Sequence, residues 1–329
     1  MKNPKRSKLI KKMLSGTAAL VLTTAGSLAC AAAFNAPADV EAIKAIEHDL
    51  ATQTSMKELI KHYAPDAVVL DIFEPGTFKG TDAIYKGFEE QMSKMQSMKS
   101  DMPDINIATN GNFACAAMTL HFNAKMTDGS TTDITLRQLD AFKKINGKWL
   151  IVQQHISLPV DAKTGMAVVN GPLPVRGPIK WAPDAIPAPS TTPENAKAEI
   201  KKWLDVGVLS DGIDQLMEYY GPGDDVLVYD TYYPGELRGL KELRKHYTPI
   251  MSSYSGAKVQ LPDLHIDSDG AFGIQIDTQT MVLDMKDGSK KAVALRQSDC
   301  MRRVNGKWYS FFEMISYPID PATGKGIME

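Results

Sequence analysis

The chain contains an internal repeat that accounts for about half of its length. Residues 136–165 and 295–324 align without a gap, and fourteen of the thirty positions are identical. The same offset of 159 residues pairs Asp71 with Asp230, and a Pro-Gly pair follows each of them. A repeat this long is a duplicated domain rather than a solenoid unit. Two domains also suit a chain of 329 residues.

Residues 1–33 are typical of a secretory signal peptide. Six Lys and Arg residues precede an apolar stretch from Met13 to about Ala29, and small residues around Ala31 fit a cleavage site. We therefore expect export to the periplasm or the medium. Lipidation at Cys30 is the less favoured alternative, because Ser27 matches that motif poorly. Removing the segment changes the formal net charge from −2 to −8, which disfavours nucleic acid and anionic membranes as partners.

Two cysteines, Cys115 and Cys300, remain after the predicted cleavage, and they occupy non-equivalent positions in the two copies. An oxidising compartment permits a disulfide between them. Buried thiols in separate domains are the favoured expectation, because free cysteine behaves as a small apolar residue.

Each copy begins with helical periodicity and continues with β-rich runs. We expect three helices, a short strand at 67–71 or 226–230 that ends before the Pro-Gly pair, and a third helix in the second copy that ends at Pro249. Three Asx-Gly turns in each copy predict four consecutive antiparallel strands. The fold class is α+β, with two tandem cone-shaped domains, each having three N-terminal helices packed on a curved, mostly antiparallel sheet. The domains cover 34–165 and 194–329, and a proline-rich, semi-rigid linker covers 166–193.

This order of elements resembles the nuclear-transport-factor-2-like fold. Residues 63–71, followed by Lys79-Gly80, resemble the segment of ketosteroid isomerases that carries the catalytic base. Residues 147–149 and 155–159 resemble the closing strands of the SnoaL-like, or polyketide-cyclase-like, group. The resemblance covers about 38–165 and 196–324. It implies a pocket inside each cone, in a fold that hosts isomerases, dehydratases, cyclases, hydrolases and pure binding modules.

The resemblance also implies roles for particular carboxyl groups. Asp71 matches the proton-abstracting base, and Asp140 matches a pocket acid that stays protonated and donates to an oxyanion. Asp230 and Asp299 are their counterparts in the second copy. The oxyanion tyrosine of the isomerases falls at Glu47 and at about Leu204 in the two copies, so steroid isomerisation is not expected.

The residues themselves suggest proton-transfer chemistry. An apolar pocket raises the pKa of a carboxyl group toward neutrality, and Gln138 would share the pocket face of its strand with Asp140. His155 beside Asp71 would form a pair able to move a proton in both directions. The second copy has Met314 in place of this histidine, so we expect the first copy to be the catalytic one.

The second copy would then hold a ligand or serve as a structural partner. Its candidate ligand-binding residues are Asp230, Asp299 and two tyrosines at the presumed pocket mouth, Tyr229 and Tyr233. Gln138, on the pocket wall of the first copy, is a further candidate ligand-binding residue.

Structural alternatives exist for each candidate residue. Asp71 and Asp230 could bond to their own turns. Asp140 and Asp299 could instead form cross-strand salt bridges with the neighbouring arginines, Arg137 and Arg296, and His155 could be a core histidine.

No metal-binding, phosphate-loop, dinucleotide or nucleophile-elbow motif occurs in the chain. We therefore expect neither a metal nor a cofactor. The leading hypothesis is an exported pocket protein that performs a cofactor-independent isomerase, lyase, dehydratase or cyclase step on a small, apolar organic ligand. The alternative is a non-catalytic ligand-binding or protein-interaction module, in which the two copies form an intrachain pseudo-dimer.

Overall fold

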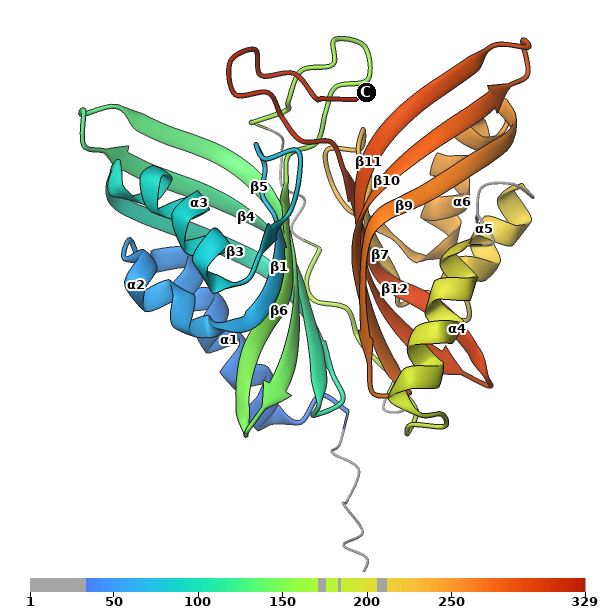
Figure 1. The fold of residues 1–329 in the computed structure, drawn as a ribbon, viewed down its shortest axis with the longest axis horizontal. Coiled ribbons are helices and arrows are strands. Elements are labelled where there is room, and N and C mark those ends of the chain that lie inside the picture. The colour runs from blue at the N-terminus through green and yellow to red at the C-terminus, as the bar shows by residue number, and fades with distance from the viewer. Residues whose placement is uncertain (1–33, 171–175, 183–184, 206–211, 329) are drawn as a thin grey trace, which may run out of the picture. The chain divides into compact units, whose positions relative to one another are not determined.

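The computed structural model describes residues 34–170, 176–182, 185–205 and 212–328. The predicted signal segment lies outside these residues. Both repeats have helices that precede and cover one face of a six-stranded sheet (Figure 1). The predicted α+β class with two tandem halves is confirmed.

The first repeat begins with two helices and a short 3-10 turn, and a third helix lies between its second and third strands. Its sheet has the order β2-β1-β6-β5-β4-β3, in which β1 runs parallel to β6 and the other neighbours are antiparallel. The elements are α1 (Pro37–Thr52), α2 (Met56–Leu59), η1 (Ile60–His62), β1 (Tyr63–Leu70), β2 (Phe78–Lys79), α3 (Thr81–Ser93), β3 (Met95–Thr109), β4 (Phe113–Met126), β5 (Thr131–Ile145) and β6 (Lys148–Ser157).

The second repeat copies this arrangement, with the sheet order β8-β7-β12-β11-β10-β9. Its elements are α4 (Pro193–Asp205), α5 (Ile213–Tyr220), β7 (Leu227–Tyr229), β8 (Leu237–Arg238), α6 (Gly239–Met251), β9 (Tyr254–Ser268), β10 (Phe272–Met285), β11 (Lys290–Val304) and β12 (Lys307–Ser316).

The Asx-Gly turns connect the four long strands of each repeat, as predicted. Asn146 and Asn305 both have φ of 51°, and the glycines that follow them also have positive φ, which is the conformation that a tight type I′ hairpin requires. The expected early end of the third helix at Pro249 is wrong, because α6 continues to Met251. Pro249 lies in the last turn, where the missing N–H costs one hydrogen bond, and Ser252 N still donates to Thr248 O.

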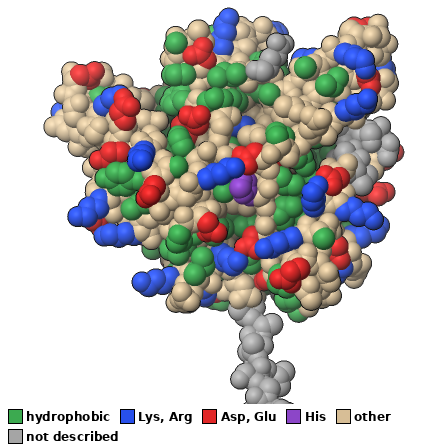
Figure 2. Space-filling model, in the orientation of Figure 1, with side chains coloured by type: hydrophobic (Ala, Val, Ile, Leu, Met, Phe, Trp, Pro, Cys, Tyr) green, Lys and Arg blue, Asp and Glu red, His purple; other side chains and the backbone are tan. Residues whose placement is uncertain are grey.

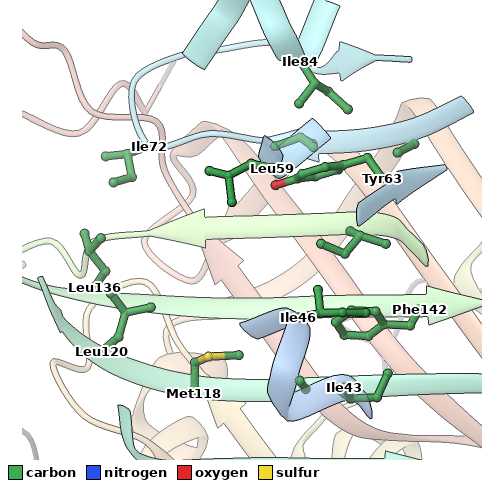
Figure 3. Packing of buried hydrophobic residues seen from close by; sticks show 14 of the residues in the cluster. Ile43, Ile46, Leu59, Tyr63, Ile72, Ile84, Met118, Leu120, Leu136 and Phe142 are labelled. Carbon is green, nitrogen blue, oxygen red and sulfur yellow. The ribbon is translucent and has the colours of Figure 1, made fainter. Parts of the chain in front are cut away.

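Strand alternation gives each sheet one face toward its own helices and one face away from them. On β5, Leu136 and Phe142 pack into the helix-covered interior of the first repeat together with Ile43, Ile46 and Met118 (Figure 3). This side is filled by an apolar cluster that includes residues from α1, α2, α3 and five strands of the first sheet. Burial of this face fixes the register of the strands, because a slip of one residue would expose it.

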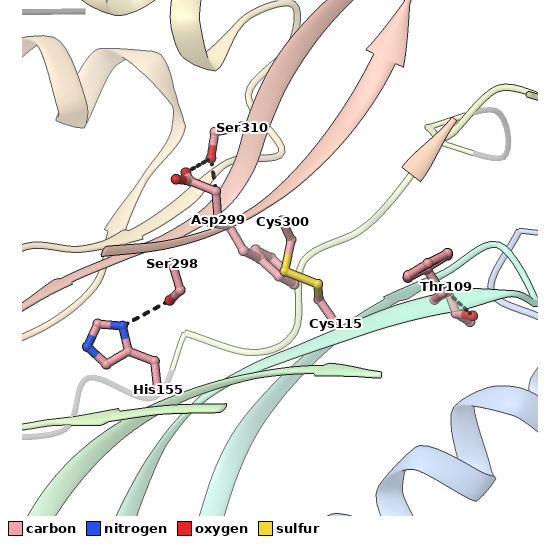
Figure 4. The surroundings of a disulfide bond; sticks show 9 residues. Thr109, Cys115, His155, Ser298, Asp299, Cys300 and Ser310 are labelled. Carbon is pink, nitrogen blue, oxygen red and sulfur yellow. Dashed lines mark hydrogen bonds between the residues drawn. A yellow bond between two sulfur atoms is a disulfide. The ribbon is translucent and has the colours of Figure 1, made fainter. Parts of the chain in front are cut away.

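The uncovered face carries contacts that join the two repeats. A disulfide links Cys115 on β4 to Cys300 on β11, with a Cα–Cα distance of 6.5 Å (Figure 4). The expectation of two separate thiols is therefore wrong. The two cysteines are not equivalent in the repeat alignment, and neither are the strands that carry them, β4 and β11. A disulfide therefore forms between non-equivalent positions of the two repeats.

The described part of the linker contacts both repeats. Ile179 N donates to Asn106 Oδ1 of the first repeat, and the Trp181 ring packs edge-on against Phe311 of the second, with 5.5 Å between ring centroids. Within the described residues, no helix is long and apolar enough to cross a membrane.

Candidate functional site

The interior of the first repeat holds a network of polar side chains around Asp140. Gln138 Nε2 donates to Asp140 Oδ2 over 2.7 Å, and Gln154 Nε2 donates to the same oxygen over 3.1 Å. The Tyr63 hydroxyl donates to Gln154 Oε1 over 2.8 Å. The predicted pairing of Gln138 with Asp140 on one strand face is thus present, and Tyr63 brings a phenol to the same network.

A second carboxyl group, Glu47 of α1, shares this interior. Gln138 Nε2 lies 3.3 Å from Glu47 Oε2, and Glu47 is buried. Burial raises the pKa of Glu47 well above its ordinary value, and the charge of Asp140 adds to that effect. Burial also raises the pKa of Asp140, to about 7. The first repeat therefore keeps carboxyl protons at this pair as the pH approaches neutrality.

Asp71 lies at the end of β1, apart from this pair. Its Oδ2 accepts a hydrogen bond from Phe73 N over 3.3 Å, which is a local turn contact. Burial raises the pKa of Asp71, although backbone N–H groups and the charge of Arg296 oppose that effect. Across the described residues, no hydrogen bond joins Asp71 to Asp140 or His155.

His155 does not join either carboxylate, which corrects the expected pair with Asp71. Its Nδ1 lies 3.0 Å from Ser298 Oγ of the second repeat (Figure 4). Its Nε2 lies 2.8 Å from Ser316 Oγ, also in the second repeat. The two-residue period of a strand explains the error. Gln154 points into the interior of the first repeat, so its neighbour His155 must lie on the opposite face of β6.

The hydrogen bonds around His155 define its protonation. Arg296 donates to Ser316 Oγ from Nε over 3.2 Å and from Nη2 over 3.0 Å. The Ser316 hydroxyl consequently uses its own proton on His155 Nε2, so we assign the proton of the imidazole to Nδ1. Burial lowers the pKa of His155 well below its ordinary value, and the charges of Arg296 and Arg137 lower it further. The ring is a neutral part of the contact between repeats.

The interior of the second repeat surrounds Asp299 with more donors. Asp299 Oδ2 accepts from Gln275 Nε2 over 2.5 Å, from Gln297 Nε2 over 2.7 Å and from the Tyr219 hydroxyl over 3.3 Å. Ser310 Oγ donates to Asp299 Oδ1 over 2.5 Å. Burial raises the pKa of Asp299 in spite of these hydrogen bonds.

A second group of acids and phenols lies beside Asp299. The Tyr220 hydroxyl donates to Glu313 Oε2. Burial raises the pKa of Glu313 well above its ordinary value, and so does the charge of Asp299. Asp277 on β10 is also buried, and its two oxygens have no hydrogen-bond partner among the described residues. Burial raises the pKa of Asp277 well above its ordinary value, and the charge of Asp299 adds to that effect. Burial thus shifts the pKa of all three carboxyl groups, Asp299, Glu313 and Asp277, in the same direction, upward.

Asp230 is the exception, because its pKa is lowered. Burial acts to raise this pKa, but the neighbouring His246, the backbone N–H of Tyr232 and the charge of Arg137 outweigh it. His246 Nε2 lies 3.2 Å from Asp230 Oδ1, and the Tyr247 hydroxyl donates to Asp230 Oδ2 over 3.2 Å. The pKa of Asp230 is thus shifted in the opposite direction to the pKa values of Asp299, Glu313 and Asp277.

A cavity of about 90 Å³ opens inside the second repeat next to these groups. The polar residues that line it are Tyr219, Tyr220, Tyr247, Gln297 and Glu313. The remaining wall is mainly apolar. It contains Leu204, Leu216, Val259, Leu261, Met281, Leu295 and Ile315, together with Gln279. A mainly apolar cavity with a few converging polar groups is the usual form of a small-molecule site.

Comparison with known proteins gives the family. The model of the SnoaL-like domain matches residues 40–161 and again residues 198–320. This chain belongs to the SnoaL-like domain family. The two matches place one SnoaL-like domain in each repeat, which confirms the tandem nuclear-transport-factor-2-like organisation.

Solved structures of that fold each align with part of the chain. A nuclear-transport-factor-2-like protein from Pseudomonas putida is 19% identical, covers 42% of this chain and 98% of its own, and has a TM-score of 0.36. A superfamily protein from Salmonella enterica is 15% identical over 40% and 95% of the two chains, with a TM-score of 0.34. A proposed dehydratase of the same family from Streptomyces avermitilis is 12% identical over 37% and 96%, with a TM-score of 0.33. No curated protein matches the chain.

Two predicted ligand-binding tyrosines of the second SnoaL-like repeat lie away from its cavity. Tyr229 is buried, its hydroxyl bonds to Thr119 Oγ1 over 3.3 Å, and the Arg137 guanidinium lies 5.9 Å from the centre of its ring. This side chain joins the two repeats, which corrects its expected place at a pocket mouth. Tyr233 is 38% exposed and packs edge-on against His246, with ring centroids 5.5 Å apart.

The two buried arginines, Arg137 and Arg296, do not form the salt bridges with Asp140 and Asp299 that were the structural alternative for these carboxylates. Arg137 Nη1 donates to Asp230 O over 2.6 Å, and Arg296 Nη1 donates to Asp71 O. Each arginine thus holds the loop that follows the first strand of the other repeat. Burial lowers the pKa of both guanidinium groups to about 10, which still leaves them charged at neutral pH.

Several interior residues escaped the sequence analysis, namely Glu47, Tyr63, Gln154, Tyr219, Tyr220, Tyr247, Asp277 and Glu313. One signal for them was available. Strand β10 reads Gln275, Asp277, Gln279 at alternating positions, where β4 has Ala116, Met118 and Leu120. Polar residues at every second position of a strand buried on that face indicate a polar interior. Among the described residues, no group of three or more His, Cys, Asp or Glu side chains could hold a metal ion.

On the face shown in Figure 2, acidic and basic side chains are interspersed.

Proposed function

We propose that the second SnoaL-like repeat binds a small, mainly apolar organic molecule and catalyses a cofactor-independent proton transfer on it. The observation that carries this proposal is the cavity whose polar wall contains Glu313, Tyr220 and Tyr247, with Tyr247 hydrogen-bonded to the ionised Asp230. A base and several acids therefore meet at one small cavity. Opposed protonation states of neighbouring carboxyl groups are the usual sign of paired acid and base roles.

Asp230 would be the base and would act through Tyr247. Tyr247 lines the cavity, and its hydroxyl donates to Asp230 Oδ2 over 3.2 Å. When Tyr247 takes a proton from the ligand, it can pass its own proton to Asp230. His246 Nε2 lies 3.2 Å from Asp230 Oδ1 and favours the ionised form of that carboxylate. Acid–base relays of this kind contribute about 10²–10⁴ to a rate.

Glu313 and Tyr220 would stabilise the negative charge that develops when the ligand loses its proton. Burial keeps Glu313 protonated, and Tyr220 donates to it. A protonated carboxyl in a dry cavity can donate to an oxyanion without reorganising. Isomerases, lyases, dehydratases and cyclases that act beside a carbonyl share this first step, so the geometry supports the step rather than one product.

Hydrogen exchange tests the proposal without knowledge of the natural substrate. Purified protein is incubated in D₂O with acetone, and deuterium incorporation is followed by NMR. We expect exchange above the buffer rate, and a loss of about tenfold or more in Tyr220→Phe. The matched control is Tyr63→Phe, which changes the equivalent phenol of the first repeat and should leave the exchange unchanged. Equal losses in both variants, or no exchange with the wild type, would contradict the proposal.

A non-catalytic role is the second candidate, and it has its own observation. Reciprocal arginine bonds and the disulfide join the two repeats, as in an intrachain pseudo-dimer, and the interior of the first repeat is filled by apolar side chains. This reading predicts that ligands bind without conversion. Calorimetric binding of a ketone that shows no deuterium exchange would favour it.

We also propose that the protein is exported and works in the periplasm or the medium. The support is the basic and apolar leader sequence together with a disulfide, which persists in oxidising compartments. Cell fractionation and the mass of the mature chain would test this. Recovery of the uncleaved chain in the cytoplasm would overturn it, and a lipid-sized mass increase that Cys30→Ser removes would instead support the lipoprotein alternative.

A further inference from the structure

The cavity of the second repeat is too small to hold a typical metabolite by itself. Its volume is about 90 Å³. Ligand pockets in proteins usually measure about 300–1,000 Å³. The cavity can therefore accept only the reacting end of a larger molecule, and the rest of that molecule must lie elsewhere.

A larger cleft adjoins the cavity on the outer side of the same repeat. It has a volume of about 820 Å³ and lies between α4, α5 and the turn that joins β11 to β12. Aromatic side chains line it, namely Trp203, Tyr219, Trp308 and Tyr309. Charged residues of both signs surround them. Among the described residues, Tyr219 is the one that lines both the cleft and the cavity.

Tyr219 forms the partition between these two spaces. Its ring stacks on Trp203, with centroids 3.7 Å apart and an angle of 13° between the planes. Its hydroxyl reaches inward, donates to Asp299 Oδ2 over 3.3 Å and accepts from Gln297 Nε2 over 3.2 Å. The Tyr219 ring is thus stacked against Trp203 on the cleft side, and its hydroxyl is hydrogen-bonded to Asp299 and Gln297 on the inner side.

Displacing Tyr219 would not leave the buried carboxyl group of Asp299 without a hydrogen-bond donor. Asp299 keeps three shorter hydrogen bonds, from Gln275, Gln297 and Ser310. A flat ring of a ligand could take the place of the tyrosine against Trp203, so that one stacked pair replaces another. The cost of opening is small for a flat molecule and larger for a globular one.

The first repeat lacks this arrangement. Aligned on Tyr63 and Tyr220, the counterpart of Tyr219 is His62, whose Nε2 lies 3.1 Å from Asp49 Oδ2. The counterpart of Trp203 is Ile46, which packs in the core of the first repeat. Among the described residues, the stacked pair of Trp203 and Tyr219 therefore has no counterpart in the first repeat.

We propose that the outer cleft binds the body of the substrate, and that the substrate is a flat, apolar ring system carrying a small oxygen-bearing group. This inference rests on the proposed function, because the oxygen-bearing group enters the cavity and the ring system displaces Tyr219 to stack on Trp203. Tyr219 and Trp203 are then specificity-determining residues for molecules that have a ring system.

A pair of ketones tests the inference. Acetone carries only the reacting group, whereas 2-acetylnaphthalene adds a flat double ring, and both exchange their methyl protons for deuterium. In Trp203→Ala we expect the KM for 2-acetylnaphthalene to rise about tenfold or more with little change in kcat, and the exchange of acetone to stay the same. Trp203→Phe keeps a stacking ring and should recover most of the affinity. His62→Ala changes the first-repeat counterpart of Tyr219, the stacking partner of Trp203, and should change neither reaction.

The outcomes separate the two proposals. Equal effects of Trp203→Ala on both ketones, or no effect on either, would overturn the role of the cleft while the exchange activity stands. If the wild type exchanges neither ketone, the proposed function fails, and the cleft is then judged by equilibrium binding of 2-acetylnaphthalene, followed by its fluorescence. Binding lost in Trp203→Ala and kept in Trp203→Phe supports the cleft, and binding unaffected by Trp203→Ala overturns it. Unfolding temperatures show whether each variant is folded.

Discussion

The two repeats have the same order of strands in their sheets, but the side chains in their interiors differ. In the first repeat, β4 presents Ala116 and Met118 to the interior, and an apolar cluster closes over one carboxyl pair. In the second, β10 presents Gln275 and Asp277 at the equivalent positions, and a cavity remains beside several acids and phenols. The two copies of a duplicated domain thus differ in the polarity of the side chains that β4 and β10 place in the interior.

The residues that the two copies share serve two different purposes. Arg137 and Arg296 face away from the helices and hold the loops of the opposite repeat. Gln138 and Gln297, one position further along, point inward and donate to Asp140 and Asp299. A residue that is identical in the two repeats can therefore belong either to the contact between the repeats or to an interior site. Only the strand face on which the residue lies distinguishes these two cases.

The largest effect should come from the base of the second repeat. Asp230→Asn removes the ionised carboxylate that accepts the proton through Tyr247, so the deuterium exchange of ketones should fall by about 100-fold or more. The comparison variant is Asp71→Asn at the equivalent position of the first repeat, and the two exchange rates are measured side by side. A larger loss in Asp71→Asn would return the chemistry to the first repeat.

Breaking the link between the copies should be the next largest effect. The disulfide between Cys115 and Cys300 closes a sequence separation of 185 residues. Replacing both cysteines with alanine should lower the free energy of unfolding by about 2–4 kcal/mol, because the unfolded chain regains its freedom. Denaturant titration of the oxidised wild type, the reduced wild type and the variant measures this. A variant as stable as the oxidised wild type would show that the bond contributes nothing.

A smaller effect follows from giving the second repeat the residue of the first. Asp277 is buried without a hydrogen-bond partner among the described residues, whereas its counterpart is Met118. Asp277→Met should raise the free energy of unfolding by about 1–3 kcal/mol, since an unsatisfied buried polar group is removed. Chemical denaturation is the measurement. Destabilisation instead would indicate that Asp277 makes an interaction worth keeping, and Met118→Leu in the first repeat controls for simple repacking.

The sequence was sufficient for the fold but not for the direction of each side chain. Repeat length, helical periodicity and the Asx-Gly turns depend on local physics, and they led to the correct α+β halves. His155 was misplaced because a strand of unknown register has two faces, and the sequence does not say which face meets the helices. Cys115 and Cys300 were misjudged for a related reason, since the contact between two sheets is a tertiary property. Glu313 and Tyr220 could have been found by comparing the interior positions of the two copies.

The carboxyl pair of the first repeat should make stability depend on pH. Burial raises the pKa of both Glu47 and Asp140 in the folded chain, while both groups ionise near pH 4 when the chain is unfolded. The folded state then holds more protons between about pH 4 and 7, so stability is greatest at the lower end and falls as the pH rises. The slope for one proton is at most about 1.4 kcal/mol per pH unit. Asp140→Asn should reduce it, as measured by denaturation at several pH values.

His155 should act in the opposite direction over an overlapping range. Burial lowers the pKa of His155 in the folded chain. Below about pH 6.5 the imidazole therefore binds a proton in the unfolded chain but not in the folded chain. Stability from this residue is complete above that pH and is lost as the pH falls. His155→Met, which copies Met314 of the second repeat, should remove the loss, although it leaves the two serine hydroxyls without their nitrogen partners. An unchanged slope between pH 6.5 and 5 would mean that the folded protein accommodates the imidazolium. The contact between the repeats would then be wetter than its hydrogen bonds indicate.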